Sequence, residues 1–408
     1  MSAKTSPTNA TASSISAHAL LQWAEAQRAR IIGDIQKLVE LESPSSDKQA
    51  VDRCGDHIRQ RFAELGGQVK VHRQKNFGDQ LQIDFAKSGV APGLRPGGSR
   101  GGATKPILLL GHYDTVWDVG TLEKMPFRNQ KGRLWGPGVF DMKAGIALAM
   151  YAIEGLRETE GGLPRSVTVL LNPDEEVGSE ASRKVTEQLA KKSAAVLVLE
   201  PAQGLDGKVK TARKGVGDFV VKVTGVAAHS GLDFEKGQNA VVELARQIDR
   251  VAEFTDLARG LTVSANVIRG GTKGNVVPAE ASVDVDVRIG KLKDGPVIEK
   301  KFRGLKPFNR KCQVEVSGGI NRPPLERTKA VAALYELARG IYWELGSELG
   351  EAAVGGGSDG YFTGALGVPT LDGLGAVGEG AHATNESIIV SELPKRVALI
   401  AELMKRIS

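Results

Sequence analysis

The sequence predicts an α/β fold: a mostly parallel sheet sandwiched by helices, with a smaller α+β unit inserted into it. Short apolar runs alternate with amphipathic helical patterns over the first half of the chain, which is typical of a parallel sheet covered on both faces. From Gly215 onward, strands with alternating apolar residues predominate. After Thr328 the chain returns to long helices around short apolar runs. The first domain is therefore expected to be discontinuous.

The first half begins with helical patterns. Apolar residues recur at three- and four-residue steps over Leu20–Leu41 and Val51–Leu65, and Gly66 and Gly67 then supply a helix stop. Strands are predicted at 68–71, 81–85, 107–110, 167–171 and 196–199, with helices at 144–157 and 179–191. Segment 88–106 is rich in Gly, Pro and Arg and is expected to be a long surface loop, to which we assign no function.

The inserted unit is predicted from three alternating segments, FVVKVTG, LTVSANVIRG and ASVDVDVRI. Helices are expected at 239–251 and 295–302, and a last strand at 314–316. We therefore divide the chain into a disordered tail at 1–17, a main domain formed by 18–213 and 327–408, and an inserted unit at 214–326.

Composition argues against several classes of function. The net charge is +6, but no dense Lys/Arg run is interleaved with aromatic residues, which make up 5% of the chain, so nucleic acid is not an expected partner. Cys54 and Cys312 lie far apart and predict neither a disulfide framework nor a cysteine zinc site. The polar N-terminal segment lacks the apolar stretch of a signal peptide or membrane anchor. A cytoplasmic protein without membrane contact is the default expectation.

Polar residues with metal-binding chemistry follow the ends of three predicted strands. His112 and Asp114 follow ILLL, Glu175 and Glu176 follow VTVLLN, and Glu200 ends AAVLVLE. Open α/β sheets build their sites at the carboxyl ends of strands, so these side chains are expected to converge. Taken singly, each of these residues could equally be an ordinary histidine in a turn, or a solvated acid, as a metal ligand.

Two further residues extend this set. Asp141 in WGPGVFDMKAG precedes a predicted helix, where it is either a helix N-cap or a carboxylate bridging two cations about 3.5–4 Å apart. His382 lies in the glycine-rich segment GEGAHATNES, with no apolar periodicity to bury it. Of Glu175 and Glu176, one can bind metal while the other acts as general base for a water. The nitrogen and oxygen donors suit zinc better than copper or calcium.

Seven segments in order resemble a known family: LLLGHYDTV, GPGVFDMKAG, NPDEEVGS, LEP, VTGVAAHSG, GGGSDG and GAHATNES. They are similar to the co-catalytic zinc peptidases, the family of glutamate carboxypeptidase, acetylornithine deacetylase, succinyl-diaminopimelate desuccinylase and peptidase T. The resemblance covers nearly the whole chain. It implies two Zn²⁺ per subunit, replaceable in vitro by Co²⁺ or Mn²⁺, and a ferredoxin-like lid domain that mediates dimerisation.

The resemblance also implies roles for residues of the main domain. His112, Asp141 and Glu200 would bind one zinc, and Asp141, Glu176 and His382 the other, so that Asp141 bridges. Asp114 would orient His112, and Glu175 would be the general base and acid. A cis peptide at Asp141–Met142 is a further family feature.

Roles in the lid follow from the same resemblance. His229 in AAHSG matches a lid histidine that supports the oxyanion in the partner subunit's site, which implies a homodimer through the lid. Asn275 and Arg288 match positions associated with the substrate carboxylate, and Arg322 is a second cation that can grip it. Between Glu200 and Gly215 the chain departs from the glutamate carboxypeptidases, and the roles of the basic residues there stay open: Lys208, Lys210, Arg213 and Lys214.

The expected reaction is hydrolysis of the amide joining an acyl or peptidyl group to a C-terminal amino acid, with glutamate favoured. The substrate is a small peptide or N-acyl amino acid with a free carboxylate. An N-acyl-amino-acid deacylase of broader specificity is the alternative. An aminopeptidase would need acidic groups for a substrate ammonium. A catalytically silent binding protein would have lost the base or a ligand, whereas Glu175 and the five ligands are present.

Overall fold

The computed structural model describes residues 10–88 and 104–408, in two compact units. Unit 1 comprises the described residues up to Thr211 together with Arg327–Ala352 and Ser358–Ser408. Unit 2 comprises Ala212–Glu326 and Ala353–Gly357. Residues 89–103 of the expected surface loop lie outside the described residues. No helix in the described part of the chain combines the length and apolar character needed to cross a membrane.

Unit 1 is built on a six-stranded sheet. Its order is β1 (Gln68–His72), β2 (Gln80–Phe85), β6 (Val167–Asn172), β3 (Ile107–His112), β7 (Ala195–Val198) and β16 (Thr370–Leu371). β6, β3, β7 and β16 run parallel, and β1 and β2 add an antiparallel edge. The predicted mostly parallel sheet is therefore confirmed.

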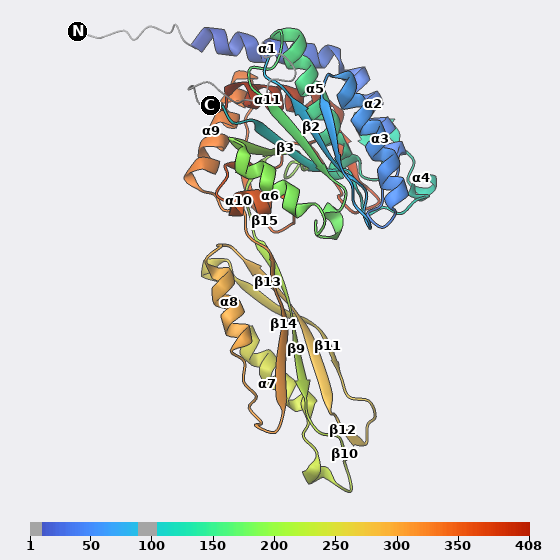
Figure 1. Ribbon diagram of the computed structural model, residues 1–408, viewed down its shortest axis with the longest axis vertical. Coiled ribbons are helices and arrows are strands. Elements are labelled where there is room, and N and C mark those ends of the chain that lie inside the picture. Colours follow the sequence, from blue (N-terminus) through green and yellow to red (C-terminus); the bar gives the residue numbers. More distant parts are fainter. Residues whose placement is uncertain (1–9, 89–103) are drawn as a thin grey trace, which may run out of the picture. The chain divides into compact units, whose positions relative to one another are not determined.

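Helices cover both faces of this sheet (Figure 1). The helices of unit 1 are α1 (Ala10–Ala26), α2 (Arg28–Glu40), α3 (Lys48–Glu64), α4 (Thr121–Lys124), α5 (Ala144–Thr159), α6 (Arg183–Lys192), α9 (Lys329–Glu344), α10 (Gly360–Ala365) and α11 (Leu393–Arg406). Leu109 of β3 packs in the larger core, to which α2, α3, α5 and α11 contribute. Leu108 and Leu110 point the other way and pack with Ala190 of α6. β3 is thus buried on both faces, as its continuous apolar run predicts.

The prediction of a disordered N-terminal tail at 1–17 is wrong for residues 10–17, because helix α1 already begins at Ala10. Ala17, Leu20 and Ala24 are fully buried in the larger core, and this burial stabilises a helix that its polar N-terminal sequence does not predict. Residues 1–9 lie outside the described residues.

A small antiparallel sheet joins two segments that are distant in sequence. Its order is β17 (Gly378–Glu379), β18 (Ser387–Ile389), β5 (Arg133–Trp135) and β4 (Arg128–Gln130). β18 pairs with β5, so that Ser387 lies opposite Trp135. The loop that carries His382 between β17 and β18 is thereby brought beside the segment that leads from β5 to Asp141.

Unit 2 has the element order β9 (Gly215–Thr224), α7 (Ala240–Ala252), β11 (Thr262–Gly270), β13 (Glu280–Ile289), α8 (Asp294–Arg303) and β14 (Gln313–Arg322). The sheet order is β11-β13-β9-β14 with antiparallel neighbours, the ferredoxin-like arrangement that the family resemblance implies. α7 and α8 lie on one face (Figure 1), where Phe219, Val221 and Val223 of β9 are buried. The alternation along β9 leaves its other face open.

The expected boundaries of the inserted unit at 214–326 need two corrections. Ala212 and Arg213, which we assigned to the main domain, already belong to unit 2, and so does a later segment. Residues 353–357, which we assigned to the main domain, belong to unit 2. Their backbone is held there because Lys214 N donates to Val354 O at 3.0 Å, and the Arg213 side chain donates to the carbonyls of Gly356 and Gly357. These contacts join residues about 140 positions apart, which no local sequence pattern reveals.

Candidate metal centre

Three parallel strands deliver polar side chains to one edge of the unit 1 sheet. His112 is the last residue of β3 and lies opposite Asn172, the last residue of β6. Glu175 and Glu176 follow in a short 3₁₀ turn, Glu175–Val177, and Glu200 comes two residues after β7. The convergence expected from the strand ends is therefore present in the structure.

Two groups of potential metal ligands form at this edge and share one residue. The first is His112, Asp141 and Glu200, and the second is Asp141, Glu176 and His382, with ligand atoms within 4.8 Å of one another in each. Asp141 contributes a different oxygen to each group. Its Oδ1 lies 3.2 Å from His112 Nε2, and its Oδ2 lies 3.5 Å from His382 Nε2. This geometry is that of a bridging carboxylate.

The donor atoms fit a pair of metal ions. His112 Nε2 lies 3.4 Å from Glu200 Oε1, and His382 Nε2 lies 3.2 Å from Glu176 Oε2. Ligand atoms around a tetrahedral ion with bonds of about 2.1 Å are separated by about 3.4 Å. In addition, the buried Oε1 of Glu176 has no hydrogen-bond partner among the described residues. A buried carboxylate oxygen of this kind calls for a cation.

The ionisation of the ligands supports the same conclusion. Hydrogen bonds to Asp141 and Glu176 raise the pKa of His382 to about 10. Burial alone would lower the pKa of His112, but hydrogen bonds to Asp114, Asp141 and Glu200 outweigh it and raise that pKa. Without metal, protons on the two histidines thus balance the surrounding acids. Metal ions would displace these protons, because a ligating histidine must be neutral.

Burial also raises the pKa of Glu176 to about 7. For Asp141, burial has the same effect, but hydrogen bonds from His112 and His382 outweigh it and hold the pKa well below the usual range. The shared carboxylate is therefore the member of the second group that is ionised most readily, as a bridge between two cations requires.

Asp114 is fully buried behind His112. Nδ1 of His112 lies 3.0 Å from the backbone carbonyl of Asp114 and 3.4 Å from its carboxylate Oδ1. The same carboxylate accepts from Ser45 Oγ at 2.6 Å and from the backbone N–H groups of Glu175 and Glu176 at 3.2 Å. Asp114 thus connects the His112 ring to the turn that carries the two glutamates, a contact that orients a metal-binding imidazole.

Glu175 belongs to neither ligand group, although its side chain is almost fully buried beside them. Its neighbour Glu176 does belong to the second group. The structure therefore places Glu176 among the potential metal ligands and leaves Glu175 outside both groups. The peptide bond between Asp141 and Met142 is cis, as the family resemblance implies.

Sequence reasoning missed two buried ionisable residues around Asp141. Lys143 is 1% exposed, and its Nζ donates to Leu41 O at 2.7 Å. Glu386 is fully buried, and its carboxylate accepts from the backbone of the Asp141 loop. Both lie in motifs that we quoted, FDMKAG and GAHATNES. The only hint of their burial in the sequence was the position of a charged residue inside a glycine-containing motif. Charged residues are ordinarily solvated, so this hint is weak.

The four residues predicted in the lid fall into two separate places in unit 2. Arg288 of β13 and Arg322 of β14 both lie opposite Val216 of β9, and hence in one row of the open face. His229 and Asn275 lie together beyond the other end of β9. There, β10 (Ala228–His229) pairs with β12 (Val276–Val277), and Ser230 N donates to Asn275 O. The row at Val216 and the far strand end at Thr224 are about 26 Å apart, at about 3.3 Å per residue.

The basic residues between Glu200 and Gly215 differ in exposure. Lys210 and Arg213 are buried, whereas Lys208 pairs with the exposed Asp206. Arg213 lines a cavity of about 750 Å³ in unit 2 together with Lys214 and Arg288. This cavity therefore contains three cationic side chains, one of which we predicted from the sequence.

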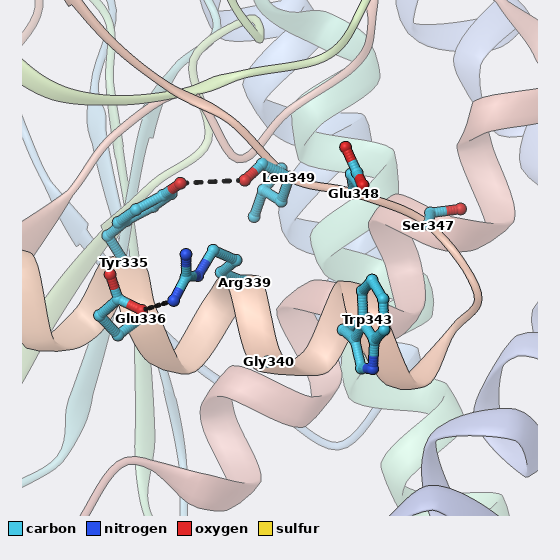
Figure 2. A pocket seen from close by; sticks show the side chains of 8 residues that line it. All are labelled: Tyr335, Glu336, Arg339, Gly340, Trp343, Ser347, Glu348 and Leu349. Carbon is cyan, nitrogen blue, oxygen red and sulfur yellow. Dashed lines mark hydrogen bonds and ion pairs between the residues drawn. The ribbon is translucent and has the colours of Figure 1, made fainter.

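A second hollow lies on α9 and the loop that follows it, at some distance in sequence from the metal centre. It has a volume of about 570 Å³ and is lined by Tyr335, Glu336, Arg339, Gly340, Trp343, Ser347, Glu348 and Leu349 (Figure 2). Tyr335 donates to Leu349 O across it at 3.0 Å, and Trp343 is 72% exposed. None of the predicted site residues lines this hollow.

The fold and the paired ligand groups define the class as a dinuclear metallohydrolase. Residues 108–406 match the family described as Peptidase family M20/M25/M40, and the chain belongs to this family. The family expected from the motifs and the hydrolytic activity are thereby confirmed. Carboxypeptidase G2 of Pseudomonas sp. (strain RS-16) is 31% identical over 389 residues, which cover 94% of this chain and 91% of that protein.

Other relatives carry different activities. Succinyl-diaminopimelate desuccinylase of Dechloromonas aromatica is 26% identical and covers 76% of this chain and 85% of its own. Among solved structures, aminopeptidase PepT of Bacillus cereus superposes with a TM-score of 0.74 at 20% identity, covering 93% of this chain and 98% of its own. A dinuclear metal-binding peptidase of the family from Bacillus subtilis has a TM-score of 0.65 at 14% identity, covering 93% and 98%. These structural similarities support the fold.

Proposed function

We propose that the protein hydrolyses the amide bond between an acyl or peptidyl group and a C-terminal amino acid, with glutamate favoured, and that its metals are two Zn²⁺. The observation that carries the proposal is the pair of ligand groups sharing Asp141, with Glu175 buried beside them. The similarity to carboxypeptidase G2 over 94% of the chain supports this choice of substrate. The desuccinylase and deacetylase relatives favour the alternative, an N-acyl-amino-acid deacylase of broader specificity.

His112, Asp141 and Glu200 would hold one metal ion, and Asp141, Glu176 and His382 the other. When bound, the pair would supply Lewis-acid activation of water and of the attacked carbonyl. Glu175 takes the proton from the attacking water and returns it to the leaving amine. Asp114 holds His112 in one orientation throughout, through the contacts at Nδ1. His229 donates a hydrogen bond to the oxyanion that develops on the carbonyl, an interaction worth about 3 kcal/mol in comparable donors.

Arg288 and Arg322 are the proposed ligands of the substrate carboxylate, because a guanidinium binds a carboxylate through paired hydrogen bonds. Arg288 already donates through Nε and Nη2 to Asp286, two residues earlier on the same strand. A substrate carboxylate therefore competes with Asp286 for this guanidinium. Asn275 lies beside His229 and far from Arg288, and it is proposed to donate through its side-chain amide to the substrate of a second copy of the chain. The cytoplasmic location stays a prediction.

The first test combines metal analysis with a panel of substrates. Elemental analysis of the purified protein is expected to find about two zinc ions per chain, as in other co-catalytic sites. Hydrolysis of N-acyl-glutamate is expected to exceed that of N-acyl-lysine and of the corresponding glutamate amides, because these lack the second carboxylate or the free C-terminal carboxylate. Equal rates across the amino acids would favour the broad deacylase. Cleavage only of peptides with a free N-terminus would indicate an aminopeptidase and contradict the proposal.

We also propose that the protein is a homodimer through unit 2, in which His229 serves the site of the second copy. A substrate of two residues extends about 7 Å, whereas His229 lies beyond the strand end that is about 26 Å from the Arg288 row. One small substrate therefore cannot contact Arg288 and His229 of the same chain. β11 is a sheet edge with exposed Val267 and Ile268, and such an edge is suited to pairing with a second chain.

A mixed dimer tests this arrangement. Glu175→Ala and His229→Ala chains carrying different affinity tags are co-expressed, and the heterodimer is purified through both tags. Although each variant alone has low activity, the heterodimer contains one complete site and is expected to show about half of the wild-type activity per dimer. The control heterodimer of Glu175→Ala with Asp141→Ala has no complete site and is expected to stay inactive. A heterodimer of the first kind without recovered activity, or a fully active monomer, would contradict the proposal.

A further inference from the structure

Glu386 is a fully buried acid that sits between the two loops of the metal centre. Each of its carboxylate oxygens accepts two hydrogen bonds. The donors are Trp117 Nε1 at 2.8 Å and Gly138 N at 2.9 Å to Oε2, and Phe140 N at 2.9 Å and Asp141 N at 3.0 Å to Oε1. Glu386 belongs to neither ligand group, and its oxygens are already occupied by N–H donors. Its contacts therefore point to a role other than binding metal.

The backbone N–H groups that Glu386 binds have no acceptors in a regular helix or strand. Gly138 adopts the left-handed region with φ of 70°, and Asp141 and Met142 have non-helical backbone angles. The N–H groups of this loop consequently converge on the Glu386 carboxylate instead of forming the regular hydrogen bonds of a helix or strand. Buried N–H groups need acceptors, and one ionised carboxylate with two oxygens supplies them. The four donors in turn offset part of the cost of burying that charge.

Glu386 is also tied closely to His382. The backbone N–H of Glu386 donates to Ala383 O, and that of Ala383 donates to Gly380 O, both at 2.9 Å. These bonds close a tight turn in which His382 adopts a positive φ of 60°. The side chain of Glu386 thus reaches the backbone of one ligand, Asp141, while its main chain belongs to the turn that presents another, His382.

We propose that Glu386 is a positioning residue that sets the spacing between Asp141 and His382, and so holds the second ligand group together. It acts through the backbone N–H of Asp141 and through the turn that presents His382, so its loss mainly affects the second group, the one that contains both residues. Outer contacts of this kind typically change metal affinity 10- to 100-fold when removed. The inference rests on the proposed metal centre and adds to it a residue that touches neither metal nor substrate.

The variant Glu386→Gln keeps the shape of the side chain but replaces one acceptor oxygen by an NH₂ donor. Two of the four N–H groups then face a donor, so two hydrogen bonds are lost. Affinity for one of the two Co²⁺ equivalents, measured by titration calorimetry of the metal-free protein, is expected to fall by about 10- to 100-fold. The visible absorption of bound Co²⁺, which reports its coordination geometry, is expected to change as well.

Glu379→Gln is the matched control, because Glu379 is a partly exposed acid of β17, at the other end of the His382 loop, and is paired with Arg133. It is expected to bind two Co²⁺ with the wild-type spectrum. Trp117→Phe provides a second variant should Glu386→Gln fold poorly. It removes one donor to Oε2, the oxygen that the Asp141 N–H does not contact, and is expected to weaken one equivalent by less than Glu386→Gln does.

The outcomes separate this inference from the proposed function. Wild-type affinity and an unchanged Co²⁺ spectrum in Glu386→Gln and Trp117→Phe would overturn the positioning role while leaving the metal centre intact. A lower thermal midpoint of the metal-free variants with unchanged affinity would likewise assign Glu386 a purely structural role. Failure of the wild type itself to bind Co²⁺ or Zn²⁺ would instead refute the proposed metal centre, and this inference with it.

Discussion

Replacing Glu175 with alanine is expected to lower kcat/KM by about 10²- to 10⁴-fold, the usual contribution of a general base, while two metal ions stay bound per chain. The reason is that Glu175 lies beside both ligand groups without belonging to either. Activity on an N-acyl-glutamate and metal content are measured on the same preparation. Glu175→Gln is expected to behave alike, since its amide cannot accept the proton of water.

Glu180→Ala is the control for this prediction. Glu180 is an exposed acid in the loop that follows Glu175, and its removal should change neither activity nor metal content. If Glu175→Ala lost a metal ion together with its activity, Glu175 would be a ligand and the division of roles between Glu175 and Glu176 would be wrong. If it kept full activity, another group would have to accept the proton.

Replacing Asp141 with alanine is expected to remove both metal ions and all measurable activity. Asp141 supplies Oδ1 to one ligand group and Oδ2 to the other, so each group is left with only two protein ligands. The measurement is metal content after dialysis, followed by titration with Zn²⁺. Each affinity should fall by more than the 10- to 100-fold effect of an outer contact.

Asp118→Asn is the matched control for Asp141→Ala, because Asp118 is an exposed acid in a neighbouring loop. It should bind two zinc ions and keep its activity. Retention of two ions by Asp141→Ala would contradict a bridging role. Loss of only one ion would show that Asp141 binds one metal alone, and that the second oxygen is held by His382 without metal.

The candidate ligand residues were predictable because each carries a local signal. His112, Glu176 and Glu200 follow apolar strands, and parallel strands share the direction of their carboxyl ends. Asp141 and His382 were found through the motifs around them, and the small sheet in which Ser387 lies opposite Trp135 brings their loops together. The alternation in unit 2 likewise predicted strands, and β9 has the alternating burial of a strand with one covered face.

The supporting residues were not predictable in the same way. Ser45 and Glu386 look like ordinary polar loop residues in the sequence, yet one donates to Asp114 and the other accepts from the Asp141 loop. Their partners lie 69 and 245 positions away. Local sequence patterns indicate which face of a helix or strand is buried. These contacts depend instead on how loops that are distant in the sequence pack together.

The fold class, the family and the candidate ligands could be predicted from the sequence, because strand periodicity and short motifs are local properties of the chain. The tertiary structure alone decided where α1 begins, which unit takes residues 353–357, and that His229 and Asn275 lie together at the opposite end of β9 from Arg288. It also decided that Glu386 is buried beneath Asp141. The physical reason is that burial and hydrogen bonding between distant segments override the local preferences of the residues involved.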